Sequence, residues 1–370
     1  MRVMVLGLRG FPEIQGGVET HAEHLYPLLV KLGCRVEVIV RSPYVPKGMT
    51  TTWRGVRFRR LWSPRPYVGG LEAFVHSLLG VLYAGLRRPD ILHIHAIGPG
   101  LMTPLARLLG LKVVVTHHGT DYDREKWGPF ERWILLTGEY LGMRYANRRI
   151  VISEVIRELV SRKYNRDSVV IPNGVHIPKM PTTRVTLNRL GLEPGRYVLQ
   201  VSRFDPGKRQ QDIMKAFASI NLPGWKLALV GALEPADEYI GAVRLQAEKT
   251  TDVVLTGFQS GLSLQELYAN AGVFVLPSSH EGLPIALLEA LSYGLPVLAS
   301  DIPSNLEVGL SSEHYFPLGD VPALADILRK IATSGFDLQH EASVRNEFKR
   351  RYDWERIAKK TLNVYHSMTH

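Results

Sequence analysis

The sequence predicts an α/β protein with two parallel-sheet domains, and three observations lead to this prediction. Short apolar runs alternate with helical patterns along most of the chain, as in sheets whose parallel strands are joined by helices. The chain has 370 residues, too many for one ordinary core. A polar, proline-containing connector separates two halves that share this alternating order. We therefore expect two doubly wound sheets, each covered by helices.

Composition restricts the class of protein further. Hydrophobic residues make up 45% of the chain and charged residues 22%, values typical of a soluble globular protein. Cys34 is the single cysteine, so no internal disulfide forms, and we expect this thiol to be a small buried group in a reducing compartment. The N-terminus lacks the apolar core of a signal peptide, and no apolar run reaches the roughly 20 residues of a membrane span. These features predict a cytoplasmic protein.

The net charge of +10 suits anionic partners. Basic residues gather in the first half, in the stretch 53–66 and at Arg87, Arg88, Arg144, Arg148, Arg149 and Arg157. Trp53, Phe58, Trp62 and Tyr67 lie among them, which favours contact with an anionic membrane surface. A solvated basic face is an equally good interpretation. The sequence contains no recognised nucleic-acid motif, so we expect no nucleic-acid partner.

The first half begins with a predicted strand, a glycine loop and a helix. The strand spans 3–6, the loop contains Gly16 and Gly17, and the helix spans about 18–32. Backbone amides at the start of a helix can hold an anion, so this arrangement suits a phosphate. It is not a dinucleotide fingerprint, because Gly-x-Gly-x-x-Gly is absent and the next strand, 36–40, ends at Arg41 rather than at an acidic residue.

Histidines follow two later strands of this half. His93 and His95 alternate onto one face of the predicted strand I-L-H-I-H, where ordinary hydrogen bonding is favoured over a metal pair. The predicted strand 112–115 ends in T-H-H-G-T-D-Y-D. The Asp121-Tyr122-Asp123 pattern beside two histidines leaves a divalent-metal site open as an alternative.

The chain then reaches a predicted domain junction. A strand at 149–153 is followed by I-P-N-G-V-H, a strong turn signal, and by the connector 177–193. We expect domains at 1–175 and 176–351. The last segment, 352–370, has one apolar helical face and is expected to pack on the first domain; that face contains Trp354, Ile357, Ala358, Leu362 and Tyr365.

The second half opens with a predicted strand, 197–201, that leads into a cationic turn. Arg203 and Lys208 flank a Pro-Gly turn ahead of a helix, an arrangement that can clamp a pyrophosphate, although solvated loop cations would look the same. Further strands are predicted at 227–230 and 253–255, and the second ends at Gly257-Phe258.

Two glutamates occupy the next strand–helix–strand unit. Glu281 lies on a glycine-containing turn after the apolar run 272–276. Pro284 stands where a helix would begin, and Glu289 lies on that helix, which Gly294 ends. Open α/β sheets bind ligands beyond the carboxyl ends of their strands, so this turn is a candidate ligand site.

The pairs Arg-x4-Lys (203 and 208) and Glu-x7-Glu (281 and 289) resemble the donor motifs of family 4 glycosyltransferases, and the resemblance covers nearly the whole chain. That family is retaining, uses nucleotide sugars and has the GT-B fold of two Rossmann-like domains facing a cleft. The stretch H-H-G-T-D-Y-D resembles members that act in bacterial surface-polysaccharide synthesis.

The resemblance implies roles for individual residues. Arg203 and Lys208, assisted by the amides of Gly16 and Gly17, would neutralise the leaving diphosphate. Glu289 would accept the ribose hydroxyls. The remaining implied contacts are Glu281 with Gly282, Leu283 and Pro284 on the transferred sugar, Gly257 and Phe258 under the base, His118 facing the sugar, and Asp121 and Asn173 orienting His118 or the acceptor.

The implied reaction is retaining sugar transfer from a nucleotide diphosphate sugar, with a UDP-sugar favoured. The acceptor would be a glycan or an undecaprenyl-diphosphate-linked lipid at the inner face of the cell membrane. The family attacks from the front face, and the leaving phosphate takes the proton, so no cofactor or metal is expected. A sugar epimerase or phosphorylase of the same fold, or a non-catalytic anion- or membrane-binding module, remains the alternative.

Overall fold

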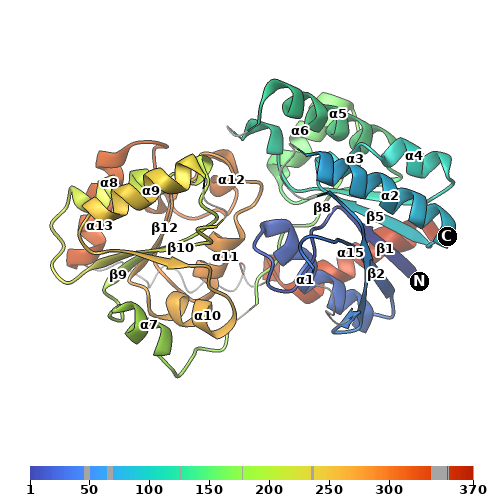
Figure 1. Cartoon of the computed structure of the whole chain (residues 1–370). Helices are drawn as coiled ribbons and strands as arrows, with labels where there is room; N and C mark the ends of the chain where they lie inside the picture. The colour runs from blue at the N-terminus through green and yellow to red at the C-terminus, as the bar shows by residue number, and fades with distance from the viewer. Residues whose placement is uncertain are drawn as a thin grey trace. The chain divides into compact units, whose positions relative to one another are not determined.

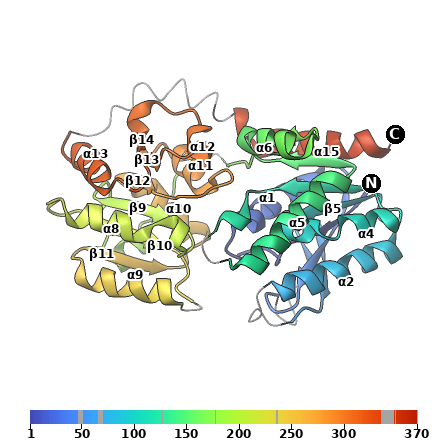
Figure 2. The ribbon, with the colours of Figure 1, turned by 90° about the horizontal axis from the view of Figure 1, so that it is seen from above.

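A computed structural model describes residues 1–45, 51–64, 70–124, 127–176, 178–234, 237–334, 348 and 350–369. The chain forms two compact units, which comprise residues 1–174 with 352–370 and residues 175–351. Figures 1 and 2 show that each unit is a sheet with helices packed around it. The predicted class, α/β with two parallel-sheet domains, is confirmed.

Within the described residues, the first unit has an eight-stranded sheet in the order β3-β4-β2-β1-β5-β6-β7-β8. Neighbouring strands are parallel, except that β3 pairs antiparallel with β4. The strands are β1 Arg2–Leu6, β2 Arg35–Arg41, β3 Thr52–Trp53, β4 Val56–Leu61, β5 Ile91–His95, β6 Val113–His117, β7 Arg148–Val151 and β8 Val169–Val170.

The helices of the first unit come mostly from the crossovers between these strands. They are α1 Gly17–Lys31, α2 Leu71–Arg87, α3 Ile97–Gly100, α4 Thr103–Leu108, η1 Asp121–Asp123, α5 Pro129–Tyr145, α6 Glu154–Tyr164 and α15 Trp354–Thr369. Pro27 lies inside α1, which continues to Lys31.

The second unit has a six-stranded parallel sheet in the order β11-β10-β9-β12-β13-β14. Its strands are β9 Tyr197–Val201, β10 Lys226–Val230, β11 Val253–Gly257, β12 Val273–Leu276, β13 Val297–Ser300 and β14 Tyr315–Phe316.

The helices of the second unit cover both faces of this sheet, and α8 and α13 lie side by side in Figure 2. They are α7 Val185–Leu190, η2 Pro206–Lys208, α8 Gln210–Ala218, α9 Glu238–Lys249, α10 Gly261–Asn270, α11 Ile285–Ser292, α12 Pro303–Leu306, η3 Ser312–His314 and α13 Val321–Ser334.

The last helix, α15, completes the core of the first unit by packing against α1 (Figure 1). Trp354 and Tyr365 are buried in the same cluster as Tyr26 of α1. Gly174 lies directly against this helix, because a Cβ atom added there would come within 2.5 Å of the Trp354 ring. The expected packing of the C-terminal helix on the first domain is therefore observed.

The surface of the first unit corrects part of the membrane interpretation. Trp53 and Phe58 pack edge-on against the buried Phe11, with ring centroids 5.7 and 5.1 Å apart, so these two rings belong to the core side of the sheet. Trp62 is 65% exposed, and Tyr67 lies outside the described residues. Arg149 donates to the carbonyl oxygen of Ala146 at 3.0 Å, at the end of α5, rather than joining an open basic face.

Two smaller expectations concern the core and the membrane. Cys34 is buried in the apolar cluster of the first unit, as predicted, and burial raises the pKa of its thiol. None of the helices in the described ranges has the length and apolar character needed to cross a bilayer.

Gly174→Ala should lower the free energy of unfolding by about 1–3 kcal/mol, because the added methyl group overlaps the Trp354 ring. Urea unfolding of the full chain measures the change. Gly98→Ala is the matched control in the same unit, since its Cβ would lie 3.5 Å from Leu135, an ordinary contact distance. Equal losses for the two variants would show that Gly174 is not a packing constraint on α15.

Candidate active site

The strand order of the second unit reverses between β9 and β12, which are neighbours in the sheet. Connections from two such strands leave toward opposite sides, and the crevice between them is where open α/β sheets bind ligands. Arg203 and Lys208 follow β9, and Glu281 follows β12. The parallel sheet thus brings residues separated by more than 70 positions to one edge.

Backbone hydrogen bonds shape the loop that carries the two cations. The Asp205 carboxylate accepts from the amide of Gly207 at 3.1 Å and stabilises the turn of η2. The carbonyl oxygen of Gly207 accepts from the amide of Ser279 at 2.9 Å, which joins this loop to the one after β12. Gln210, at the start of α8, donates to the carbonyl oxygen of Arg203 at 2.8 Å. The two loops therefore form one connected rim.

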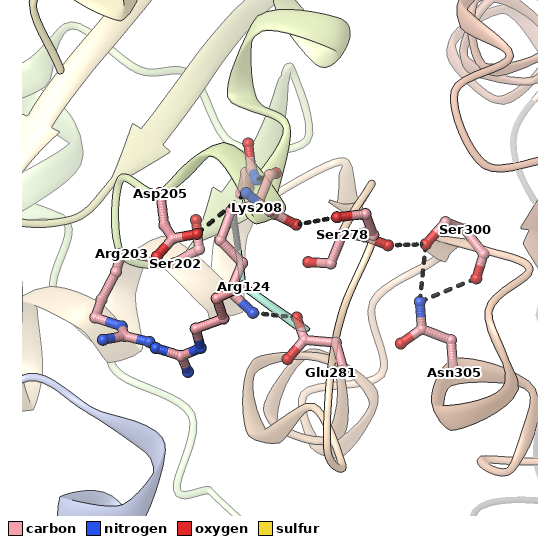
Figure 3. Close-up of polar contacts among 12 residues, drawn as sticks. Arg124, Ser202, Arg203, Asp205, Lys208, Ser278, Glu281, Ser300 and Asn305 are labelled. Atoms are coloured by element: carbon pink, nitrogen blue, oxygen red, sulfur yellow. Dashed lines mark hydrogen bonds and ion pairs between the residues drawn. The ribbon is translucent and has the colours of Figure 1, made fainter. Parts of the chain in front are cut away.

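Lys208 and Glu281 form an ion pair across this rim, shown in Figure 3. Their side chains are 17% and 12% exposed, so solvent reaches both groups, although neither lies free on the surface. Arg203 extends from the same loop and is half-buried (Figure 3). The sequence motifs indicated both charges separately but gave no sign that they pair, because the pairing depends on which strands are neighbours.

A buried serine–asparagine network supports the segment just before Glu281 (Figure 3). The Ser300 hydroxyl donates to the carbonyl oxygen of Ser278 at 2.5 Å. The side-chain amide of Asn305 donates to the Ser300 carbonyl oxygen at 2.9 Å. Because all three residues are buried, these bonds hold the backbone rigidly. Nothing in the sequence singled out this support.

Glu289 lies on α11 with one tyrosine as its partner. The hydroxyl of Tyr268 donates to its carboxylate at 2.9 Å, and the ring of Tyr268 stacks on that of Tyr293 at a centroid distance of 5.4 Å. Burial raises the pKa of Glu289 to about 7, because a single hydrogen bond offsets little of the loss of hydration. A carboxylate with spare acceptor capacity in a partly desolvated position is suited to binding hydroxyl groups.

The remaining candidate donor residues of this unit occupy the same edge of the sheet. Gly257 ends β11 with φ of +72°, and a Cβ atom there would meet open space, so backbone conformation rather than close packing requires glycine. Phe258 is 42% exposed. After Glu281, Leu283 is buried and Pro284 directly precedes α11, as its position in the sequence predicted.

The first unit has its own point of reversed strand order, between β1 and β5. Gly16 and Gly17 lie there, at the start of α1. Arg9 grips Glu19 with two hydrogen bonds of 3.0 Å, and a Cβ atom at Gly16 would lie 2.2 Å from that carboxylate. Burial opposes ionisation of Glu19, but the hydrogen bonds and charge of Arg9 lower its pKa. Nothing in the sequence predicted this ion pair between Arg9 and Glu19.

His118, in the loop after β6, contacts other histidines. One of its ring nitrogens, Nε2, lies 2.8 Å from Nδ1 of His95, and the two rings are stacked. Burial, and then the neighbouring histidines, lower the pKa of His118 well below its ordinary value, so it is neutral near pH 7. Asn173 is buried, and its amide oxygen accepts from Nδ1 of His21 at 3.0 Å, so it orients a histidine of the unit interior.

The neighbouring His117 points away from His118, into a buried network. Its Nε2 donates to Glu139 at 2.8 Å, and its Nδ1 accepts from the amide of Gly119 at 3.1 Å. Burial opposes ionisation of Glu139, but bonds from His117 and then Lys163 lower its pKa to about 2. Both ring nitrogens of His117 are thus engaged, so it is not available as a ligand beside Asp121.

Asp121 and Asp123 lie in η1, directly after this loop. The carboxylate of Asp121 pairs with Arg124 at 3.1 Å. Within the described ranges, the one group of three residues close enough to share a metal ion consists of histidines and includes neither aspartate. Among the residues that the structure describes, which do not include 125–126, the Asp-x-Asp pattern therefore has no third ligand of that kind beside it.

Two sequence families match the chain, one in each unit. Residues 16–174 match the glycosyl transferase 4-like domain, and residues 188–349 match the glycosyl transferases group 1 family. The phosphatidyl-myo-inositol mannosyltransferase of Mycobacterium leprae is 26% identical over 96% of this chain and 94% of its own length.

Solved structures resemble the fold over the same extent. Sucrose-phosphate synthase from Thermosynechococcus elongatus has a TM-score of 0.85 at 22% identity, covering 99% of this chain and 98% of its own. The Anabaena protein Alr3699/HepE, solved with UDP-glucose, has a TM-score of 0.81 at 18% identity, covering 99% of this chain and all of its own. The chain belongs to the family 4-type glycosyltransferases of the GT-B fold.

Proposed function

We propose that the protein is a retaining glycosyltransferase that moves a sugar from a nucleotide diphosphate sugar to a glycan or lipid-linked acceptor. The observation that carries this proposal is the set of charges at the switch point of the second sheet. Arg203 and Lys208 follow β9, and Glu281 follows the adjacent strand β12. Cations suit the diphosphate, and a carboxylate beside them suits the hydroxyls of the sugar attached to it.

The Lys208–Glu281 pair gives the donor a defined way to enter. A diphosphate carries more negative charge than one carboxylate, so it competes with Glu281 for the ammonium group of Lys208. Glu281 is then released to accept sugar hydroxyls, beside the backbone of Gly282, Leu283 and Pro284. During transfer the leaving diphosphate gains charge, and Arg203 and Lys208 stabilise it without a metal ion.

Other residues contact the ribose, the base, the transferred sugar and the phosphates. Glu289 accepts the ribose hydroxyls while Tyr268 orients it, and Gly257 and Phe258 lie next to the base. In the first unit, His118 contacts the transferred sugar, and the amides of Gly16 and Gly17 assist the phosphates. Retention proceeds by front-face attack, in which the departing phosphate oxygen takes the proton of the acceptor.

The donor base and the acceptor are supported by similar proteins. The HepE structure contains UDP-glucose, and the Mycobacterium leprae protein is named for a phospholipid acceptor. We therefore favour a UDP-sugar and an undecaprenyl-diphosphate-linked or other lipid acceptor at the inner face of the membrane. Exposed Arg57, Arg59 and Arg60 of β4 are suited to an anionic lipid surface.

Calorimetric titration of the full chain with UDP, dTDP, GDP and ADP tests the donor. UDP should bind most tightly, and a UDP-sugar should be consumed only when an acceptor is present. Conversion without an acceptor would identify an epimerase, and dependence on inorganic phosphate with a glucan would identify a phosphorylase. Liposome binding with no nucleotide binding at all would leave only a non-catalytic membrane module.

Lys208→Ala should reduce kcat/KM for sugar transfer by an amount equivalent to about 2–4 kcal/mol of transition-state stabilisation. Steady-state kinetics with the identified donor and acceptor measures the loss. Lys215→Ala is the matched control, because Lys215 is exposed on α8, well along the helix from the candidate site. Unchanged turnover in Lys208→Ala would remove Lys208 from the mechanism.

Binding of UDP should strengthen as pH rises from 6 to 8. The pKa of Glu289 is raised to about 7, so its ionised fraction grows about tenfold over this range, and the ionised form accepts both ribose hydroxyls. Glu289→Gln should bind UDP more weakly and lack this rise. Because titration of UDP itself affects both proteins equally, the difference between their calorimetric profiles isolates Glu289, and parallel profiles would contradict its role.

A further inference from the structure

Three imidazoles converge inside the first unit from three separate elements. His21 comes from α1, His95 from the end of β5 and His118 from the loop after β6. One nitrogen of each ring lies within 4.8 Å of the corresponding nitrogens of the other two. We propose that His21, His95 and His118 form a binding site for a borderline transition-metal ion such as Zn²⁺.

Hydrogen bonds on the outer side of two rings direct their lone pairs inward. The amide oxygen of Asn173 can only accept, so Nδ1 of His21 carries the proton and its Nε2 is free to bind a metal. Nε2 of His95 contacts the hydroxyl of Tyr26, which leaves its Nδ1 facing His118. Outer partners that fix the tautomer and the ring orientation are typical of histidine metal ligands.

The Tyr26 hydroxyl has a further partner, which makes this arrangement self-consistent. When Nδ1 of His95 binds an ion, its Nε2 carries the proton and donates to the oxygen of Tyr26. The Tyr26 hydroxyl then donates to the hydroxyl of Tyr365, which donates to Nδ1 of His93 at 2.6 Å, and Nε2 of His93 donates to Thr116 at 2.6 Å. Each imidazole and phenol proton along this buried row has an acceptor, so metal binding is compatible with the hydrogen bonds around His95.

Charge and geometry also suit the ion. Burial lowers the pKa of His21 to about 4 and those of His95 and His118 well below the usual value, so all three are neutral ligands near pH 7. Zinc–nitrogen bonds of about 2.0–2.1 Å place neighbouring ligands about 3.3 Å apart. Nδ1 of His95 and Nε2 of His118 lie 2.8 Å apart in a hydrogen bond. A small movement of the loop that carries His118 would replace this hydrogen bond with a bond from each nitrogen to the metal.

The fourth position would remain open, because three protein ligands leave a tetrahedral ion one site for water. His118 is the half-exposed member of the three, so that position lies on its side of the cluster. Under the proposed function, an ion here would engage the ring that contacts the transferred sugar. This consequence rests on that proposal, whereas the metal site itself does not: zinc should inhibit transfer, not support it.

Calorimetric titration of EDTA-treated, desalted full-length protein with Zn²⁺ tests the site directly. One ion should bind per chain, and Co²⁺ should give the visible absorption of a four- or five-coordinate ion. His118→Ala, a half-exposed loop substitution, should weaken zinc binding on the order of 100-fold or more, and Asn173→Ala should weaken it about 10–100-fold by releasing the His21 ring. His24→Ala, on the same helix as His21 but outside the cluster, should bind like the parent.

Thermal unfolding provides a second readout, since an ion bound only to the folded state raises Tm. Zinc should raise the Tm of the parent and of His24→Ala but not that of His118→Ala. Failure of the parent to bind one ion, or equal affinity in the His118→Ala and His24→Ala variants, would overturn the proposal.

Assays of sugar transfer distinguish the proposed glycosyltransferase function from the proposed metal site. Transfer should survive EDTA and fall when zinc is restored. Activity that requires a metal would contradict the inhibitory role and the metal-free mechanism, while the binding measurement would stand. An absence of transfer under every condition would count against the proposed function alone.

Discussion

The structure depends on one constraint of parallel sheets, which is that the carboxyl ends of all strands meet at the same edge. In each unit the strand order reverses once, at β1/β5 and at β9/β12, and the connections there leave toward opposite faces. Residues distant in the sequence gather at these two points, Lys208 with Glu281 in one unit and His21 with His95 in the other. The proposed chemistry therefore follows from topology first and from residue type second.

Buried carboxylates near these edges are each held by hydrogen-bonding partners. Burying a carboxylate without a partner costs free energy. Accordingly, Glu19 is paired with Arg9. Glu139 accepts hydrogen bonds from His117, Lys163 and Tyr164. These pairs fix the glycine loop before α1 and the loop after β6. Glu289 differs from them: it has the hydroxyl of Tyr268 and keeps acceptor capacity in reserve, as a ligand-binding group must.

Much of the fold could be predicted because local signals agree with the final structure. Apolar runs coincide with the strands, Pro284 precedes α11, and the apolar face of the tail became the buried face of α15. The family motifs also identified the strand ends where the candidate residues lie. Partners across the sheet could not be predicted, because pairing of Lys208 with Glu281, or of Arg9 with Glu19, depends on three-dimensional proximity. The packing of Trp53 and Phe58 on Phe11 could not be predicted for a related reason, since period-two patterns do not say which face is buried.

The docking of α15 has a consequence for how the protein is made. Trp354 and Tyr365 belong to the core of the first unit, but residues 175–351 are synthesised before them. During translation the first unit therefore cannot complete its core until the whole second unit has left the ribosome. Until then, the apolar surface that α15 covers remains exposed. Contacts between α1 and α15 are among the longest-range in the chain. The entropic cost of closing the loop between these helices is therefore offset last during folding. The second unit is continuous in sequence and has no such delay, so it can complete its fold before the first unit does.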